Sequence, residues 1–275
     1  MTDISKLLKI AVEASIYAGE EILKVYESDD FQIVSKADNS PLTLADKNAH
    51  NKIMSFLKKT EIPVLSEEGQ HLPYKERKKW KCFWLVDPLD GTKEFIKRNG
   101  EFTVNIALIK KQIPVAGVIY VPVTKTLYFA DIESGAFKID EIPSKEYENM
   151  TELIKYAHKL PLPEKNRPYT VVGSRSHMND ETKTYFNKLK KEYGDIEIIS
   201  RGSSLKLCMI AEGKADIYPR FGPTMEWDTA AGHAIVSAAG GTVTKINDTL
   251  LLYNKENLLN PFFKAKCNPV FFVDK

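Results

Sequence analysis

The sequence predicts an α/β (α+β) protein whose two halves are built differently. The first half combines amphipathic helices with closely spaced strands, and the second half alternates strand with helix. Between them, the proline-rich stretch 141–168 favours a boundary that separates an N-terminal α+β unit (1–142) from a C-terminal α/β unit (143–275). With 275 residues, of which 43% are hydrophobic, the chain can form one large domain or two closely packed ones.

Charge and cysteine content narrow the class of protein. The 39 basic and 37 acidic side chains give a net charge of +2, so nothing calls for a nucleic-acid partner. The three cysteines are far apart, lack CxxC spacing and fit a reducing cytoplasm. No apolar run approaches the roughly 18 residues of a membrane span. We therefore expect a cytoplasmic protein, with peripheral association at the inner membrane left open.

Two amphipathic helices are expected near the start of the chain. Residues 3–27 repeat apolar side chains at helical spacing, which predicts a helix packed along one face. Pro41 marks a break, and a second helix follows through Ile53 and Leu57. Asp46 lies near the start of this second helix, where an acidic side chain interacts favourably with the helix dipole. That placement alone requires no catalytic role.

Strands follow in both halves. The segment Pro63–Leu65 predicts a short strand that ends at Glu67 and Glu68, and the next apolar runs predict an antiparallel meander. In the second half, three strands each precede a helix and two more strands come near the end. The meander covers 102–109, 115–120 and 126–130, and the later strands cover 169–173, 196–199, 215–218, 242–244 and 270–273.

The stretch 84–95 carries the densest functional signal. Residues 83–86 predict a strand, and we expect Asp87-Pro88 to end it because proline cannot donate to a sheet ladder. Asp90 is the predicted N-cap of a following helix, and Gly91 allows close approach to a ligand. A divalent cation prefers carboxylate oxygens and an anion prefers a helix N-terminus. The stretch therefore suggests metal-assisted phosphoryl chemistry, although the same run by itself also fits an ordinary turn.

Two further acidic positions fit the same chemistry. Glu67 ends a strand as Asp87 does, and residues at the carboxyl ends of neighbouring strands can converge on one crevice. Asp228 lies at the start of a helix rich in small residues, which permit close packing. A simple capping role for Asp228 explains its position equally well.

Taken together, these motifs resemble the signature of the lithium-sensitive inositol monophosphatase superfamily. The matching residues are Glu67, the run Asp87-Pro88-Leu89-Asp90-Gly91-Thr92, and Trp227-Asp228 with Ala230-Ala231-Gly232. Within that superfamily, 93–96 and 99–105 closely resemble the bacterial 3'(2'),5'-bisphosphate nucleotidases of the CysQ type. The resemblance spans nearly the whole chain and implies the layered α/β/α/β/α sandwich shared with fructose-1,6-bisphosphatase.

The resemblance implies a phosphatase that converts adenosine 3',5'-bisphosphate to AMP and phosphate in sulfur assimilation or nucleotide recycling. The sulfated relative, 3'-phosphoadenylyl sulfate, is a second candidate substrate. Two or three magnesium ions would be held by Glu67, Asp87, Asp90, Asp228 and the main-chain carbonyl of Leu89. The catalytic residues would be Asp46, Glu67 and Thr92, with either Asp46 or Glu67 accepting the proton.

Substrate contacts implied by the resemblance lie on both sides of the site. The Gly91 and Thr92 N–H groups would hold the reacting phosphate. Ser203, Lys206 and Arg220 would hold the 5'-phosphate and ribose, and His177 would lie near the base. Ordinary surface charge explains the two cations and the histidine as the simpler alternative.

Two other functions stay open at this point. The same enzyme type could act on an inositol or sugar phosphate, which would not need Lys206 and Arg220. A non-catalytic protein that binds a nucleotide is the third possibility. The small-molecule substrate is the only partner we expect, and the chain is expected to be a monomer or a homodimer.

Overall fold

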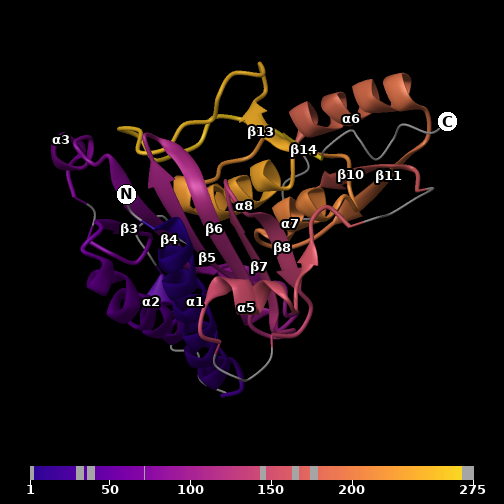
Figure 1. Ribbon diagram of the computed structural model, residues 1–275. Helices are drawn as coiled ribbons and strands as arrows, with labels where there is room; N and C mark the ends of the chain where they lie inside the picture. Colours follow the sequence, from indigo (N-terminus) through magenta and orange to yellow (C-terminus); the bar gives the residue numbers. More distant parts are fainter. Residues whose placement is uncertain are drawn as a thin grey trace.

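The computed structural model describes residues 3–28, 34–35, 41–70, 72–142, 147–162, 167–173 and 179–267, without the side chains of 34–35 and 41–42. Two sheets alternate with layers of helices (Figure 1). Helices α1 (Ile4–Tyr26) and α2 (Leu44–Leu57) form one outer layer, and α6 (Asp180–Tyr193) forms the other. Helices α7 (Leu205–Glu212) and α8 (Glu226–Ala238) lie between the sheets. The predicted fold class is confirmed.

The larger sheet has seven strands in the order of the sequence, β3 to β9. Its first pair, β3 and β4, is parallel, and each later pair is antiparallel. The predicted meander is thereby confirmed. The strands are β3 (Val64–Ser66), β4 (Cys82–Asp90), β5 (Thr103–Lys110), β6 (Ile113–Val121), β7 (Thr126–Asp131), β8 (Gly135–Ile139) and β9 (His158–Lys159).

Both faces of this sheet are covered, and β4 shows the consequence. Trp84 and Val86 belong to the core under α1 and α2, whereas Phe83 and Leu85 belong to the core that includes α7 and α8. Successive strand residues point to opposite faces, so a strand covered on both sides must be apolar throughout. This explains the continuous apolar run at 83–86 that the sequence displays.

Close packing in the middle layer depends on small side chains. A Cβ added at Gly232 of α8 would lie 2.4 Å from Leu207 Cδ1 of α7, a distance that side chains do not tolerate. The small residues at the start of α8 therefore let the two helices meet, as expected from the sequence. This contact brings the N-termini of α7 and α8 to the same region, which contains the candidate site.

The smaller sheet has five strands in the order β11-β10-β12-β14-β13. Strand β10 is parallel to both neighbours, and β14 is antiparallel to its neighbours. These strands are β10 (Tyr169–Gly173), β11 (Ile196–Ser200), β12 (Ile217–Arg220), β13 (Thr242–Lys245) and β14 (Phe263–Lys266). The remaining short elements are β1 (Val34–Ser35), β2 (Pro41–Leu42), η1 (Lys58–Thr60), α3 (Tyr74–Arg77), α4 (Thr92–Ile96) and α5 (Met150–Ile154).

The predicted division at residue 142 stays a prediction. Two elements that follow it lie with the larger sheet: β9 pairs with β8, and Met150 and Leu153 of α5 belong to the core beneath α1. The chain joins the smaller sheet only at β10. The predicted strand 270–273 lies outside the described residues, and β14 is not among the strands predicted from the sequence.

The expected strand end at Asp87-Pro88 is wrong. Strand β4 continues to Asp90, and its pairing with β5 shifts between Asp87 and Asp90. One extra residue is accommodated there, which is a β-bulge, and a bulge tolerates proline because it needs no ladder N–H at that point. Gly91, with a φ of 94°, takes the N-cap position that was predicted for Asp90.

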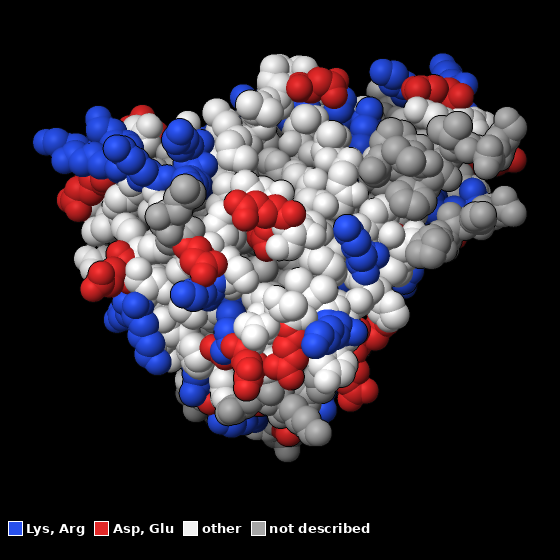
Figure 2. All heavy atoms as spheres, viewed as in Figure 1, with Lys and Arg blue, Asp and Glu red and all other residues white. Residues whose placement is uncertain are grey.

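The charged stretch 73–79 predicts a solvated surface loop, and the structure corrects this expectation. It forms the short helix α3, and basic side chains gather on the surface around it (Figure 2). Lys75, Lys78 and Lys79 are exposed there, but Arg77 is only 3% exposed. No helix among the described residues is long and apolar enough to cross a bilayer.

Candidate active site

The acidic residues of the candidate site start from adjacent strand ends. The parallel pairing of β3 with β4 sets Ser66 opposite Val86, and the Glu67 N–H donates to the Val86 carbonyl at 3.1 Å. Glu67 and Asp87 are therefore the next residues along two neighbouring strands. The bulge that follows takes Pro88 and Leu89 out of the ladder, and pairing resumes at Asp90 opposite Thr103. The structure thus places the two positions at adjacent strand ends, and their convergence on one crevice stays a prediction.

Two helix starts bring further carboxylates. Asp46 in the first turn of α2 accepts hydrogen bonds from the Thr43 N–H at 2.7 Å and the Thr43 hydroxyl at 2.6 Å. Asp228 in the first turn of α8 accepts one from the Met225 N–H at 2.9 Å. Each carboxylate thus occupies the third helical position of a capping box, and the N-cap role considered for Asp228 is wrong because Met225 is the N-cap. Capping also fixes each side chain in place.

Thr92 lies between two of the candidate catalytic positions. Its hydroxyl is 3.4 Å from Asp46 Oδ1 and 3.4 Å from the main-chain oxygen of Leu89. It is the first residue of α4, directly after the left-handed Gly91. A Cβ at Gly91 would lie 3.2 Å from Ser203 Cβ, so glycine is needed here both for its backbone angle and for close approach of the 203 loop.

Electrostatics show that the acidic residues form one interacting group. Burial raises the pKa of the Asp87 carboxyl well above its usual value, and the nearby Glu67, Asp90, Asp228 and Asp46 raise it further. Burial also raises the pKa of Asp228 well above its usual value, with Asp90 adding to the effect. Desolvation and like charge both disfavour the ionised form, and a divalent cation would reverse that preference.

The donor set fits magnesium, because carboxylate and carbonyl oxygens are the ligands that this cation prefers. Among the described residues, however, no three His, Cys, Asp or Glu side chains converge as a preformed metal centre. The acidic residues thus share one electrostatic environment while their oxygens are held by separate caps and hydrogen bonds. Binding of a cation would require some of these side chains to turn toward it.

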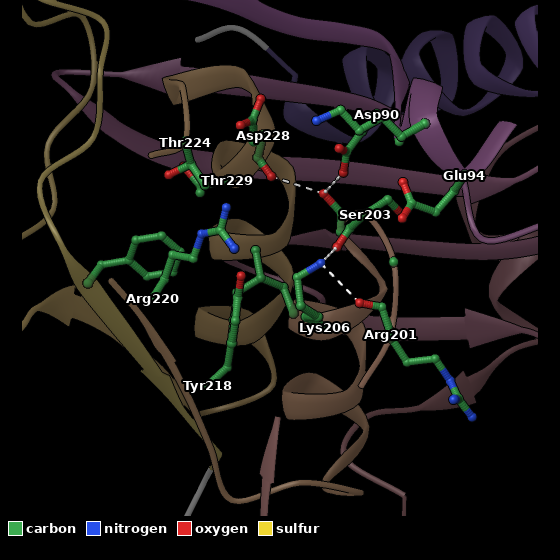
Figure 3. A pocket seen from close by; sticks show the side chains of 16 residues that line it. Asp90, Glu94, Arg201, Ser203, Lys206, Tyr218, Arg220, Thr224, Asp228 and Thr229 are labelled. Carbon is green, nitrogen blue, oxygen red and sulfur yellow. Dashed lines mark hydrogen bonds between the residues drawn. The ribbon is translucent and has the colours of Figure 1, made fainter. Parts of the chain in front are cut away.

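The basic residues predicted for the substrate share a cavity with two of the carboxylates. The cavity has a volume of about 150 Å³ and opens between α4, α7, α8 and β12 (Figure 3). Of the predicted site residues, it is lined by Asp90, Gly91, Ser203, Lys206, Arg220 and Asp228. Glu94, Tyr218 and Thr224 also line it, and His177 lies outside the described residues. The structure therefore brings together groups that lie more than 100 positions apart in the sequence.

The cations in this cavity are only partly satisfied by the protein. Lys206 Nζ donates to the main-chain oxygens of Ser203 at 2.5 Å and Arg201 at 3.3 Å. Arg220 Nη2 donates to the Pro223 carbonyl at 3.0 Å. Desolvation lowers the pKa of Lys206 to about 8, against an opposing effect of Asp90.

Two buried polar atoms at the cavity have no hydrogen-bond partner within the described part of the chain. They are Arg220 Nε and Ser203 Oγ, and Ser203 also has an unusual φ of 40°. Buried polar groups are nearly always hydrogen-bonded in native proteins. An anionic ligand in the cavity would supply an acceptor for both.

Sequence reasoning assigned no role to Ser204 and Asn105. Ser204 Oγ lies 2.9 Å from Asp90 Oδ2 and 2.9 Å from the main-chain oxygen of Asp228, and Asn105 Nδ2 donates to Ser204 Oγ at 2.9 Å. Ser204 is adjacent to Ser203 and follows a strand, which could have singled it out. Nothing in the spacing of the sequence links it to Asn105, because the pair meets only through the fold.

Comparison with known proteins agrees with this geometry. The model of the inositol monophosphatase family matches residues 3–266. The 3'(2'),5'-bisphosphate nucleotidase CysQ of Shigella flexneri is 48% identical over 252 residues, which cover 90% of this chain and 94% of that protein. The protein of the same name from Buchnera aphidicola is 45% identical over 266 residues, covering 94% of this chain and 93% of its own.

Solved structures lead to the same conclusion. The crystal structure of CysQ from Bacteroides thetaiotaomicron, described as a bacterial member of the inositol monophosphatase family, matches with a TM-score of 0.88 and 51% identity. That match covers 96% of this chain and 97% of the other. The resemblance seen in the sequence motifs is confirmed, and the chain belongs to the inositol monophosphatase family.

Proposed function

We propose that this chain is a magnesium-dependent 3'(2'),5'-bisphosphate nucleotidase that converts adenosine 3',5'-bisphosphate to AMP and inorganic phosphate. The single observation that carries the proposal is the shared cavity, in which Asp90 and Asp228 face the same space as Lys206 and Arg220. A substrate with two phosphates needs both kinds of group, one to assist reaction and one to bind. The curated relatives of this name support the same substrate.

Enzymes of this family are generally magnesium-dependent phosphatases, and five groups of this chain would hold the metal. They are the carboxylates of Glu67, Asp87, Asp90 and Asp228 and the carbonyl of Leu89, for two or three ions. When bound, magnesium lowers the pKa of coordinated water and offsets negative charge on phosphate oxygens. The bulge between Asp87 and Asp90 leaves Leu89 without a ladder partner, and its carbonyl oxygen lies 3.4 Å from the Thr92 hydroxyl.

The residues around Thr92 would prepare the nucleophile and hold the reacting phosphate. The Thr92 hydroxyl and the Asp46 carboxylate, 3.4 Å apart, can orient a water molecule between them. Asp46 or Glu67 would accept the proton that this water loses. The Gly91 and Thr92 N–H groups would donate to phosphate oxygens at the start of α4.

The second phosphate would bind in the basic half of the cavity. Arg220 and Lys206 would pair with its charge, and Ser203 would donate from its unpartnered hydroxyl. His177 would lie near the base. 3'-Phosphoadenylyl sulfate carries an equivalent anionic group at the 5' position and is a further candidate substrate. A cytoplasmic location and a monomeric or dimeric state stay predictions from the sequence.

A substrate panel tests this function. Phosphate release is measured from adenosine 3',5'-bisphosphate, inositol monophosphate and fructose 1,6-bisphosphate, with magnesium and again with a chelator. We expect the adenosine compound to give the highest kcat/KM, the chelator to abolish release and added magnesium to restore it. A preference for inositol monophosphate would support the alternative phosphatase, and tight nucleotide binding without turnover would support a non-catalytic protein.

A further inference from the structure

Ser204 occupies the N-cap position of α7, yet its side chain does not cap that helix. A serine at this position ordinarily accepts a hydrogen bond from an N–H two or three residues later. Here the hydroxyl is used elsewhere, because it lies 2.9 Å from Asp90 Oδ2 and 2.9 Å from the Asp228 main-chain oxygen. The Ser204 hydroxyl thus contacts two candidate metal ligands, Asp90 at its carboxylate and Asp228 at its main-chain oxygen.

Two buried side chains in sequence orient the Ser204 hydroxyl: Asn105 bonds to it, and Thr103 bonds to Asn105. Asn105 Nδ2 donates to Ser204 Oγ at 2.9 Å, and Asn105 Oδ1 accepts from the Thr103 hydroxyl at 3.0 Å. Thr103, Asn105 and Ser204 are 0%, 1% and 3% exposed, so water does not compete for these bonds. Because Asn105 donates to Oγ, the Ser204 proton is directed to Asp90 or to the Asp228 carbonyl, and a carboxylate is the stronger acceptor.

The same serine belongs to the loop that carries the proposed contacts to the second phosphate. Lys206 Nζ donates to the Ser203 carbonyl at 2.5 Å, and the Gly202 N–H donates to Glu101 Oε2 at 2.7 Å. Residues 202–206 therefore form a short segment that Lys206 holds from within and Glu101 holds at its start. The hydrogen bond of Ser204 links the position of this segment to Asp90.

We propose that Ser204 is a positioning residue that couples the metal ligand Asp90 to the nucleotide-binding segment 202–206, so that metal and nucleotide bind cooperatively. This inference rests on the proposed function and deepens it. The coupling is reciprocal: if nucleotide strengthens metal binding by some factor, metal strengthens nucleotide binding by the same factor. Asn105 supports the coupling by holding the Ser204 hydroxyl in its orientation.

AMP is the suitable probe for this coupling. It keeps the 5'-phosphate that segment 202–206 would bind, and it lacks the 3'-phosphate that would lie against the metal. Cooperativity between AMP and magnesium therefore cannot come from a phosphate that bridges the two. Isothermal titration calorimetry gives the magnesium affinity with and without saturating AMP, and the AMP affinity with and without magnesium, independently of turnover.

We expect the wild-type protein to show a coupling factor of about ten, within the usual range for linked sites. Ser204→Ala should bring that factor close to one, and Ser204→Thr, which keeps the hydroxyl, should restore most of it. The matched control is Ser203→Ala, because the neighbouring hydroxyl has no contact with Asp90. It should weaken AMP binding and leave the coupling factor unchanged.

The outcomes separate this inference from the proposed function. Wild-type protein that binds magnesium and AMP independently, or a Ser204→Ala variant with the wild-type coupling factor, would overturn the role of Ser204 and leave the proposed function standing. Wild-type protein that binds neither ligand would overturn both. Loss of coupling in Ser203→Ala equal to that in Ser204→Ala would also contradict the proposal.

Discussion

The acidic side of the site consists of Glu67, Asp87, Asp90 and Asp228, and the basic side consists of Lys206 and Arg220. Backbone pairing mainly holds the acidic side, whereas the basic side is held by side chains that bind loop carbonyls. Glu67 and Asp87 follow a parallel ladder, and the Glu67 N–H itself bonds to the Val86 carbonyl. By contrast, Lys206 and Arg220 each donate to main-chain oxygens of their own loops. Ladder pairing fixes the backbone positions of the metal ligands, whatever occupies the site. The basic loops are held by hydrogen bonds from their own cationic side chains, so they can adapt to a bound anion.

This difference suggests a division of labour between the two sides. Substitutions on the acidic side should affect the chemical step, because those carboxylates would serve every phosphate substrate. Substitutions on the basic side should affect which substrate is chosen. Asp228 links the two sides, since it lines the cavity with Lys206 and Arg220 and its charge also raises the pKa of the buried Asp87 carboxyl.

The largest effect is expected for Asp90→Asn. Asparagine keeps the size of the side chain and an oxygen that can accept from Ser204, but it removes the charge that would bind magnesium. Loss of about 4 kcal/mol of transition-state stabilisation corresponds to about a thousandfold in kcat. Steady-state kinetics at fixed magnesium measure this loss for each substrate, and a thermal melt checks that the fold survives. Near-normal turnover by a folded variant would show that the proposed metal site is wrong.

A smaller effect, on stability, is expected for Arg77→Met. The buried guanidinium donates to Asn254 Oδ1 at 2.9 Å and to the main-chain oxygens of Lys255 and Glu256 at 2.6 and 2.7 Å. The substitution leaves these acceptors without a hydrogen-bond donor, so the free energy of unfolding should fall by about 3 kcal/mol. Urea denaturation measures the change.

The matched control for that experiment is Lys75→Met, an exposed position on the same short helix. Its free energy of unfolding should change by less than about 0.5 kcal/mol. Arg77 is linked to the acidic side through α8, because it bonds to Asn254, and the Asn254 and Lys255 N–H groups both bond to Glu226 at the start of that helix. The comparison therefore tests whether side chains also hold the acidic side. Equal stability of the two variants would show that Arg77 contributes nothing specific.

The smallest and most selective effect is expected on the basic side. A charge-assisted hydrogen bond contributes about 1.5–3 kcal/mol, so Arg220→Ala should lower kcat/KM for adenosine 3',5'-bisphosphate by about ten- to a hundredfold. Adenosine 3'-monophosphate has no 5'-phosphate, so the kcat/KM for this substrate should fall little. Lys206→Ala should behave similarly, with an added loss because Lys206 also holds the Ser203 carbonyl.

The ratio between the two substrates is the quantity that decides this prediction. Lys190→Ala, which removes an exposed positive charge from α6 on the outer face of the smaller sheet, is the control and should leave the ratio unchanged. If Arg220→Ala impairs both nucleotides equally, the basic side supports the fold or the metal site and does not select the substrate.

Much of the acidic side could be predicted from the sequence because its signals are local. Glu67 ends one apolar run and Asp87 ends the next, and the structure places these runs side by side as β3 and β4. Pro88 was misleading, since a bulge lets the strand continue where proline alone suggests an end. For the same reason the N-cap of α4 is Gly91 and not Asp90, the residue that the sequence predicts.

The long-range contacts that support the site could not be predicted in the same way. Arg77 looked solvated because its sequence neighbours are charged, and only the fold shows that it is buried against Asn254. Asn105 and Ser204 lie 99 positions apart, so no periodicity connects them. Such contacts depend on how distant parts of the chain pack together, and local propensity carries no information about that packing.

The central claim is that the acidic side reacts with the 3'-phosphate while the basic side binds the 5'-phosphate. Phosphorus NMR during hydrolysis of adenosine 3',5'-bisphosphate in the presence of magnesium tests it most directly, because the two monophosphate products have separate signals. We predict that adenosine 5'-monophosphate and inorganic phosphate appear together in equal amounts, with no adenosine 3'-monophosphate. Accumulation of adenosine 3'-monophosphate would mean that the 5'-phosphate is cleaved, and would contradict the assignment of the two sides.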